Sequence, residues 1–273
     1  MKILAARCFL SILAALFSSL MNRVHPVPHP LRRPYDALVT LLGALYFGLG
    51  GLAYSVAGVV GAAVSRGRSG RLRGRRAVGA GFRSFLGFWK LSGLVTVDTS
   101  ALESLRGEPG LVIAPNHPSV LDAVFIMARL PEVACVLKAG LLRSPFIGGG
   151  ARWSGHISND AGAGMVRQAR AELARGGQLL VFPEGTRTRP EADRVSGFKG
   201  AFALVARAAQ VPVQTVILRY NTRLLGKGWP PWRLPDYPLV FRAELGRRFA
   251  PPPPDGDLRA WMAEIEAYFR SVL

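Results

Sequence analysis

An uncharged, mostly apolar stretch near the start of the chain, Ala37–Ser65, constrains the fold more than any other feature of the sequence. It exceeds the roughly 20 apolar residues that a helix needs to cross the hydrocarbon core of a bilayer. Glycine weakens helix interiors, so the interruption Gly48–Gly51 also allows two short helices folded as a re-entrant or interfacial hairpin. We therefore expect a membrane-associated helical segment, and a buried helix pair of a soluble protein stays open as the alternative.

The segment that follows the apolar stretch is dense in arginine. It contains Arg66, Arg68, Arg71, Arg73, Arg75 and Arg76. Basic flanks of this kind lie on the cytoplasmic side of membranes and attract anionic headgroups. The formal net charge of +18 for the whole chain also implies an anionic partner. Glycine and serine separate the arginines, where a single-strand binder would place aromatic residues for stacking. We therefore expect membrane lipids as partners, and no nucleic acid.

The first 35 residues form an N-terminal apolar extension with a linker. Lys2 and Arg7 precede the apolar run Cys8–Met21, a pattern that resembles the charged and hydrophobic regions of a signal peptide. No small-x-small cleavage site follows, and the next residues are rich in proline, histidine and arginine. Two explanations stay open: a short membrane-associated helix, or a chain that starts at Met21.

The remainder of the chain alternates short apolar runs with stretches of helical periodicity, which is typical of an α/β domain. We therefore divide the chain into the extension 1–35, a membrane-associated helical segment with its basic flank at 36–79, and an α/β domain at 80–273. Strands are expected at Leu94–Val97, Leu111–Ala114, Ala134–Leu137, Gln178–Phe182, Val211–Leu218 and Leu239–Leu245. Helices are expected after Pro118 and at 161–175, 199–209 and 257–273.

The first motif with chemical content is NHPSVLD, Asn116–Asp122, which follows a predicted strand and opens a predicted helix. Pro118 suits a first helical turn because it needs no amide donor there. His117 and Asp122 are therefore close in space. A carboxylate beside an imidazole holds one tautomer and stabilises the protonated ring, which leaves the other nitrogen able to take a proton from an alcohol. The motif predicts a general base and its orienting residue, without a serine or cysteine nucleophile.

The second motif is FPEGTR, Phe182–Arg187, at the end of a predicted strand. Open α/β sheets bind their ligands at the carboxyl ends of strands. Arg187 can hold a phosphate through two charge-assisted hydrogen bonds, and Thr186 can add a hydroxyl. Glu184 would repel a phosphate, so we expect it to order the loop or to fix Arg187.

Together the two motifs resemble those of the glycerolipid acyltransferase family typified by bacterial 1-acylglycerol-3-phosphate acyltransferase, in order and in spacing. NHPSVLD is similar to that family's NHxSxxD block, and FPEGTR to its acceptor-phosphate block. Lys138 with Pro145 and Gly148 is similar to the middle block, and Val211–Val213 to the final apolar block. The resemblance covers about residues 80 to 250 and implies an α/β fold with a central mixed sheet flanked by helices.

The resemblance also implies site residues and a reaction. His117 takes the role of catalytic base and Asp122 that of its orienting partner. The substrate-binding residues it implies are Asn116, Ser119, Lys138, Glu184, Gly185, Thr186 and Arg187. The reaction is transfer of a fatty acyl chain from acyl-coenzyme A or acyl-carrier protein to a hydroxyl of a lysophospholipid, with 1-acylglycerol-3-phosphate as the leading acceptor. Acceptors from specialised lipid pathways, and a non-catalytic phospholipid-binding membrane protein, are the alternatives.

One departure from the family pattern concerns the middle block. That block commonly ends in an apolar residue followed by Asp and Arg, whereas this chain has Asp160 followed by Ala161. Arg143 and Arg152 are the candidates to replace the missing basic residue. The acceptor headgroup therefore stays open.

The acyl donor is the only co-substrate expected, and no tightly bound cofactor is implied. The four histidines show no metal-ligand spacing, so we expect no metal site. We expect His25 and His29 to be solvent-exposed and His156 to be structural. The localisation implied is a bacterial inner membrane, with the catalytic domain facing the cytoplasm. The sequence does not indicate an oligomeric state.

Overall fold

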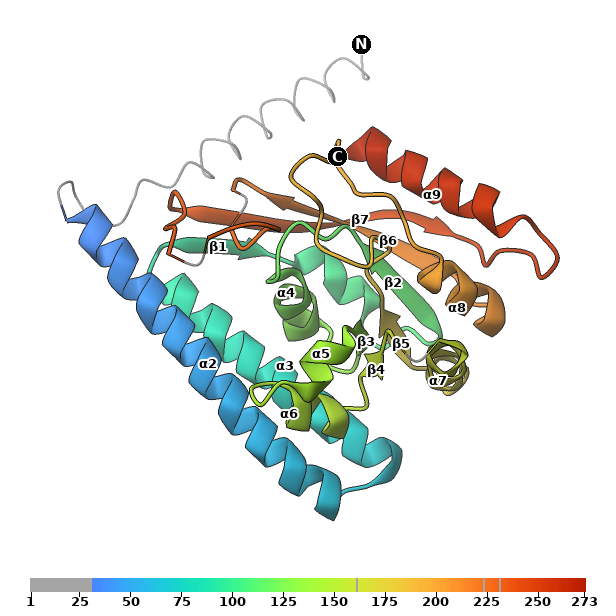
Figure 1. Ribbon diagram of the computed structural model, residues 1–273, viewed down its shortest axis with the longest axis horizontal. Helices are drawn as coiled ribbons and strands as arrows, with labels where there is room; N and C mark the ends of the chain where they lie inside the picture. Colours follow the sequence, from blue (N-terminus) through green and yellow to red (C-terminus); the bar gives the residue numbers. More distant parts are fainter. Residues whose placement is uncertain (1–30, 161, 223, 231) are drawn as a thin grey trace, which may run out of the picture.

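The computed structural model describes residues 31–160, 162–222, 224–230 and 232–273. These residues form a mixed β-sheet with helices on both faces, so the α/β class and the central mixed sheet expected from the sequence are confirmed (Figure 1). The predictions for the run Cys8–Met21, for His25 and for His29 lie outside the described residues.

The strands follow the apolar runs of the sequence. They are β1 (Val95–Asp98), β2 (Leu111–Pro115), β3 (Ala134–Leu137), β4 (Ile157–Ser158), β5 (Gln178–Leu180), β6 (Val213–Tyr220) and β7 (Leu239–Phe249). Within the described residues they form one seven-stranded sheet in the order β1-β7-β6-β2-β5-β3-β4. Neighbouring strands are parallel except β6 and β7, which are antiparallel. The carboxyl ends of β2, β3, β4, β5 and β6 therefore meet at one edge of the sheet.

Both faces of the sheet are covered by helices, and strand alternation divides the core into two layers. Leu111 and Ile113 of β2 belong to one apolar cluster, whereas Val112 and Ala114 belong to the other. The first face is covered by α2 (Arg32–Val64), α3 (Gly67–Leu91) and α4 (Asp122–Arg129), and the second by α7 (Ala163–Ala174), α8 (Ala201–Ala209) and α9 (Leu258–Val272). Short helices η1 (Ser100–Leu105), α5 (Ala139–Arg143) and α6 (Gly148–Trp153) lie in the connections.

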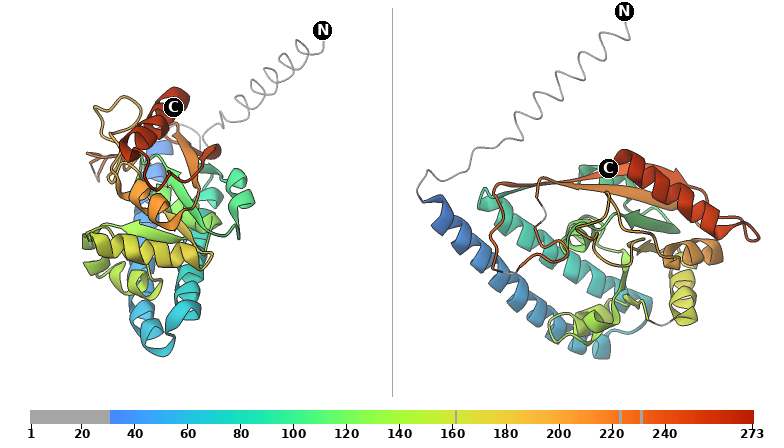
Figure 2. Two further views of the ribbon diagram at one scale, coloured as in Figure 1. Left: turned by 90° about the vertical axis from the view of Figure 1, so that its right-hand side faces the viewer. Right: turned by 45° about the horizontal axis from the view of Figure 1, so that its top comes forward.

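The apolar stretch forms one continuous helix, α2, so Gly48–Gly51 does not divide it. α2 and α3 lie side by side along one side of the molecule (Figures 1 and 2). Small residues let α2 approach the body of the protein closely. A Cβ on Gly58 would come within 2.3 Å of the Gly150 amide nitrogen, and a Cβ on Gly61 would meet the Trp153 ring at 2.5 Å. α2 is therefore packed against the α/β domain along one of its faces.

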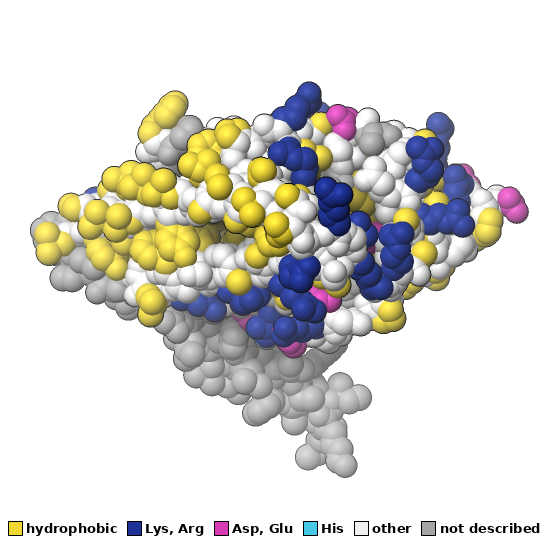
Figure 3. Space-filling view, turned by 90° about the horizontal axis from the view of Figure 1, so that it is seen from below, with side chains coloured by type: hydrophobic (Ala, Val, Ile, Leu, Met, Phe, Trp, Pro, Cys, Tyr) yellow, Lys and Arg dark blue, Asp and Glu magenta, His cyan; other side chains and the backbone are white. Residues whose placement is uncertain are grey.

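The opposite face of α2 is exposed and apolar. The large side chains on it are Leu38, Leu41, Leu42, Leu45, Leu49, Leu52, Val56, Val59, Val60 and Val64. α2 is long and apolar enough to cross a membrane, and it is the one such helix in the part of the chain that the structure describes. On the face of the molecule seen in Figure 3, hydrophobic side chains gather on one side, and most Lys and Arg side chains on the other. This arrangement indicates association of the apolar surface with a membrane.

Five elements were not expected from the sequence: helix α3, strand β4, and the short helices η1, α5 and α6. α3 continues the arginine-rich segment as a helix of 25 residues, in which Arg75 is fully buried together with Phe85 and Trp89. β4 has only two residues, which is too short to show a periodicity of its own. The last helix, α9, packs its apolar side chains against the second face of the sheet.

Candidate active site

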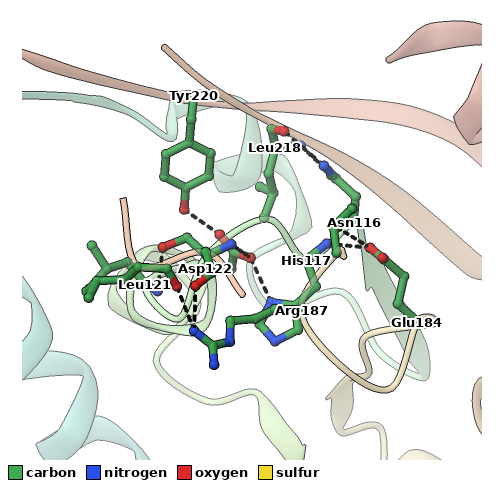
Figure 4. Close-up of polar contacts among 12 residues, drawn as sticks. Asn116, His117, Leu121, Asp122, Glu184, Arg187, Leu218 and Tyr220 are labelled. Carbon is green, nitrogen blue, oxygen red and sulfur yellow. Dashed lines mark hydrogen bonds and ion pairs between the residues drawn. The ribbon is translucent and has the colours of Figure 1, made fainter. Parts of the chain in front are cut away.

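The two sequence motifs meet at the edge of the sheet where the parallel strands end. His117 follows β2, and Asp122 is the first residue of α4. His117 Nδ1 lies 2.7 Å from Asp122 Oδ2, so the predicted pairing of base and carboxylate is present (Figure 4). The Asp122 carboxylate is fully buried, whereas the His117 side chain is 17% exposed. Because Asp122 has only acceptor oxygens when ionised, Nδ1 carries the proton and donates to it.

Asp122 is held from several sides. Its Oδ2 also accepts from the Ser119 amide at 3.0 Å, and its Oδ1 accepts from the Tyr220 hydroxyl at the end of β6. Burial raises the pKa of Asp122, and the hydrogen bonds from His117, Tyr220 and Ser119 oppose that rise. Burial and the nearby carboxylate raise the pKa of Tyr220 well above its ordinary value, so its phenol keeps the proton that it donates.

The other nitrogen of His117, Nε2, has no hydrogen-bond partner within the part of the chain that the structure describes. The imidazole stacks on the Phe182 ring, with centroids 3.8 Å apart and an interplanar angle of 22°. The Asp122 bond and this stacking fix the ring in two directions. His117 also lines a cavity, so the site presents one oriented nitrogen lone pair to a bound molecule.

Asn116 and Ser119 hold the motif in place and do not line the cavity. The Asn116 side chain donates to the Leu218 carbonyl and accepts from the Leu218 amide, at 3.0 and 2.7 Å, which joins β2 to β6. The Ser119 hydroxyl donates to the Leu224 carbonyl at 2.8 Å. Both side chains are buried, so the structure places these two predicted substrate-binding residues behind the site.

Glu184 joins the two motifs. Its Oε1 accepts from the His117 amide at 2.9 Å and from the Thr188 hydroxyl at 2.8 Å, and its Oε2 accepts from the Ser196 amide at 2.8 Å. The carboxylate is buried and lies outside the cavity lining. Of the two expectations for Glu184, ordering of the loop is what the geometry shows. Arg187 is fixed by the Leu225 and Gly226 carbonyls instead, at 2.9 and 3.0 Å.

The cavity beside His117 has a volume of about 480 Å³. It brings together four of the predicted substrate-binding residues, Lys138, Gly185, Thr186 and Arg187. The wall is otherwise mostly apolar, and no Asp or Glu belongs to the lining found among the described residues. The cavity therefore combines a base, cationic groups and an apolar surface, which suits an anionic molecule with a hydrocarbon chain.

Lys199 also lines the cavity, and the sequence reasoning missed it. Its stem lies over Gly185, where an added Cβ would meet Lys199 Cδ at 2.7 Å, and its amide donates to the Pro183 carbonyl at 2.7 Å. The signal available in the sequence was a lysine at the first position of the predicted helix 199–209. Arg143 and Arg152, the candidates to replace the missing middle-block residue, do not line the cavity.

His156 sits elsewhere and in a different environment. Its Nδ1 accepts from the Cys135 amide at 3.1 Å. Burial, with a smaller contribution from Arg75, lowers the pKa of His156 to about 3. No group of three or more side chains suited to a metal ion occurs among the described residues.

Comparison with known proteins agrees with this geometry. The acyltransferase family model matches residues 96–219, which include both motifs. Lyso-ornithine lipid O-acyltransferase of Pseudomonas aeruginosa is 35% identical over 118 residues, covering 42% of this chain and 44% of that protein. 1-Acyl-sn-glycerol-3-phosphate acyltransferase of the same organism is 27% identical over 158 residues, covering 56% of this chain and 58% of that protein. Residues 96–219 of this chain are thus similar to acyltransferases that act on lysolipids.

One solved structure shows a similar fold. The crystal structure of the 1-acyl-sn-glycerophosphate (LPA) acyltransferase PlsC from Thermotoga maritima matches with a TM-score of 0.59 and 24% identity, over 87% of this chain and 96% of that chain. The alignments with the curated relatives are shorter: the chain spans between 42% and 58% of their length.

Proposed function

We propose that this protein is an O-acyltransferase that moves a fatty acyl chain from a thioester donor to a hydroxyl of a lysophospholipid. The observation that carries the proposal is the His117–Asp122 pair at the wall of a cavity that also holds Lys138, Arg187 and Lys199. The pair supplies a base, and the three cations supply a place for a phosphate.

In the proposed reaction, His117 Nε2 takes the proton of the acceptor hydroxyl while its oxygen attacks the thioester carbonyl carbon. Asp122 stabilises the imidazolium that forms, because its carboxylate accepts the Nδ1 proton in a hydrogen bond. The carbon–sulfur bond then breaks, and the imidazolium returns the proton to the leaving thiolate. The acyl chain passes directly from donor to acceptor, so the reaction needs no acyl-enzyme intermediate and no metal.

The charges of the cavity favour 1-acylglycerol-3-phosphate as the acceptor. Its phosphate monoester is dianionic near neutral pH and complements three cationic side chains. Arg187 is already oriented by two carbonyls, so little side-chain entropy is lost when its remaining N–H groups bind a phosphate. The donor is acyl-coenzyme A or acyl-carrier protein, both of which are acidic and suit the basic surface.

We further propose that the exposed face of α2 lies in the cytoplasmic leaflet of a bacterial inner membrane, with the catalytic domain in the cytoplasm. α2 packs on the domain at both Gly43 and Gly61, so only its outer face is available to lipid. This arrangement suits a helix that lies along the membrane surface, close to a substrate that is itself a membrane lipid.

A second acceptor is favoured by one observation. The most identical of the relatives described above acylates lyso-ornithine lipid by name, and the family's middle-block basic residue is absent here after Asp160. An ornithine headgroup has an ammonium group and a carboxylate but no phosphate, so its net charge is near zero, and it complements the three cations in the cavity less well than a dianionic phosphate does. The charge of the cavity therefore ranks lysophosphatidic acid above it.

Acyl transfer in detergent-solubilised membranes tests the proposal. Labelled acyl-coenzyme A or acyl-carrier protein is offered with lysophosphatidic acid, lyso-ornithine lipid and other lysolipids. We expect lysophosphatidic acid to be used, and His117→Ala to lose roughly 10²–10⁴-fold in rate, the range for a general base. Arg143→Gln, an exposed neighbour outside the cavity, is the matched control and keeps its rate. A folded His117→Ala protein with more than a tenth of the wild-type rate would contradict the assignment of the base.

A further inference from the structure

A second cavity lies at the turn between α2 and α3 and shares no lining residue with the catalytic cavity. Its volume is about 490 Å³, within the range of small-molecule sites. It is enclosed by the end of α2, the start of α3, α6 and the last turns of α7. The proposed acyltransferase reaction makes no use of it.

Four arginines line this cavity: Arg66, Arg71, Arg152 and Arg175. The acidic residue in the lining is Glu172, and Arg75 already binds its carboxylate at 2.6 Å. Arg66, Arg71 and Arg175 form no ion pair within the part of the chain that the structure describes. The lining thus has an excess of positive charge that the protein itself does not neutralise.

Two further groups add donors to this cationic lining. His156 lines the cavity, and because its Nδ1 accepts from the Cys135 amide, its neutral ring carries the proton on Nε2. α3 starts at Gly67 with no acidic residue in its first turn and no side-chain cap. Its free amides and positive end add to the charge of the neighbouring arginines, and an anion bound here would offset all of them.

The surroundings of the cavity decide which kind of anion fits. Val59, Val60 and Val64 are exposed on the last turns of α2, the helix whose end supplies Ala62 to the lining of the cavity. They extend the exposed apolar face of α2 to its end, and Arg66 follows Val64 by two residues. A free phosphate would use only the arginines, whereas a phospholipid would use both the charged cavity and the apolar face.

We propose that the cavity at the α2–α3 turn binds the phosphate-bearing headgroup of an anionic membrane phospholipid, as a site separate from the catalytic cavity. The acyl chains of that lipid lie along the apolar face of α2. The basic flank singled out in the sequence thereby acquires a specific role: Arg66 and Arg71 belong to a built pocket, whereas Arg73 lies outside it.

Calorimetric titration of the full chain in a neutral detergent tests this site. The probes are short-chain phosphatidylglycerol, phosphatidylcholine with the same chains, and inorganic phosphate. The cavity variant is Arg71→Gln with Arg175→Gln. The matched control is Arg73→Gln with Arg170→Gln, which removes the same charge from exposed positions on the same two helices outside the cavity. Any binding of the probes at the catalytic cavity is common to both variants.

We expect the cavity variant to bind phosphatidylglycerol at least roughly tenfold more weakly, as loss of charge-assisted hydrogen bonds would give, and the control to stay within about twofold of wild type. Gln168→Trp, which fills the cavity from an exposed helical position without changing the charge, should weaken binding as well. Equal weakening in the cavity variant and the control would overturn the proposal, because bulk charge would then explain the binding. Phosphate binding as tight as lipid binding would overturn it too, in favour of a free anion.

This outcome is independent of the acyltransferase reaction. Transfer to lysophosphatidic acid in neutral micelles should be unchanged in the cavity variant. A protein that binds phosphatidylglycerol through Arg71 and Arg175 but acylates nothing would disprove the proposed function and leave this site standing.

Discussion

The two described histidines, His117 just after β2 and His156 just before β4, have opposite roles in the hydrogen-bond network. His117 donates its Nδ1 proton to the buried Asp122 carboxylate, so its lone pair is on Nε2 and faces the catalytic cavity. His156 accepts at Nδ1 from the Cys135 amide, so its proton is on Nε2. One ring is a base toward its cavity, and the other is a donor toward a cavity lined by arginines.

The difference shows that the partner of Nδ1 decides what a histidine can do. A carboxylate both selects the basic tautomer and stabilises the charge that the ring acquires. A backbone amide selects the other tautomer and cannot stabilise an imidazolium, because it is a hydrogen-bond donor. The charge of Arg75 disfavours protonation of His156 further. Histidine content alone therefore says little about the site, whereas the group bonded to Nδ1 says a great deal.

Asp122→Asn should have the largest effect of the substitutions considered, because it would remove the difference in tautomer between the two histidines. Asparagine can present its amide group to His117 Nδ1, which favours the tautomer that His156 has, with the proton on Nε2. We expect the rate constant of acyl transfer to fall by roughly 10²–10⁴-fold, with little change in the acceptor KM. Steady-state kinetics check this, and circular dichroism confirms the fold. A loss below about fivefold would show that the tautomer does not matter.

Lys199→Gln should have the next largest effect. It tests the difference between the two cavities, because Lys199 lines only the catalytic one. Loss of one charge-assisted hydrogen bond to the acceptor phosphate should raise its KM by roughly 10–100-fold, with a smaller change in the rate constant. Arg143→Gln is the control outside the cavity. If KM for lysophosphatidic acid does not change, Lys199 does not contact the headgroup.

His156→Asn tests the other ring through the pH dependence of stability. The folded-state pKa of His156, about 3, lies below the ordinary value of 6.5, so the unfolded chain takes up the proton first as the pH falls. This group's contribution to stability is complete above pH 6.5 and is lost progressively toward pH 3. Between pH 7 and pH 5 the loss is at most about 2 kcal/mol.

Asparagine keeps an acceptor for the Cys135 amide and cannot titrate in this range. In urea unfolding in neutral detergent, the variant should therefore lose less stability than wild type between pH 7 and pH 5. Equal losses in the two proteins would mean that His156 is protonated as readily in the folded chain as in the unfolded one.

Tyr220→Phe should have the smallest effect. It removes one of three hydrogen-bond donors to Asp122 and leaves those from His117 and Ser119. We expect a decrease of roughly tenfold in the rate, because the carboxylate is less well held. The measurement is the rate under saturating acceptor, with Tyr268→Phe on α9 as the matched control. A loss as large as that of Asp122→Asn would assign the phenol a more direct role.

The strands of the fold could be predicted from the sequence because each is an apolar run between turn residues. Helix α3 could not, because the first part of its buried face is mostly Gly70, Gly74, Arg75 and Gly79, which do not form an apolar stripe, and large apolar residues follow only from Phe85 onward. Gly48 and Gly50 looked like a break in α2, yet each faces open space and the helix continues through both. The glycines that matter for packing, Gly58 and Gly61, are distinguished only by their partners on α6.

In the site, Lys138 and Arg187, which carry charge into the cavity, were predictable from the motifs, whereas Lys199 and the hydrogen-bond network behind the cavity were not. The role of Glu184 could not be decided from the sequence, because its hydrogen-bond partners lie up to 67 residues away from it along the chain. Tyr220 had no motif of its own and reaches Asp122 only because β6 lies next to β2. Lys199 depends on a loop that folds back over Gly185.

The close packing of α2 on α6 has a consequence for how substrate arrives. With α2 on the membrane surface as proposed, its close packing at Gly58 and Gly61 would hold the catalytic cavity at one height above the lipid. In the proposed reaction, a lysolipid would reach the cavity by lateral diffusion within the leaflet. The distance between its hydroxyl and its headgroup would then decide which hydroxyl reaches His117, and with it the regiochemistry of acyl transfer.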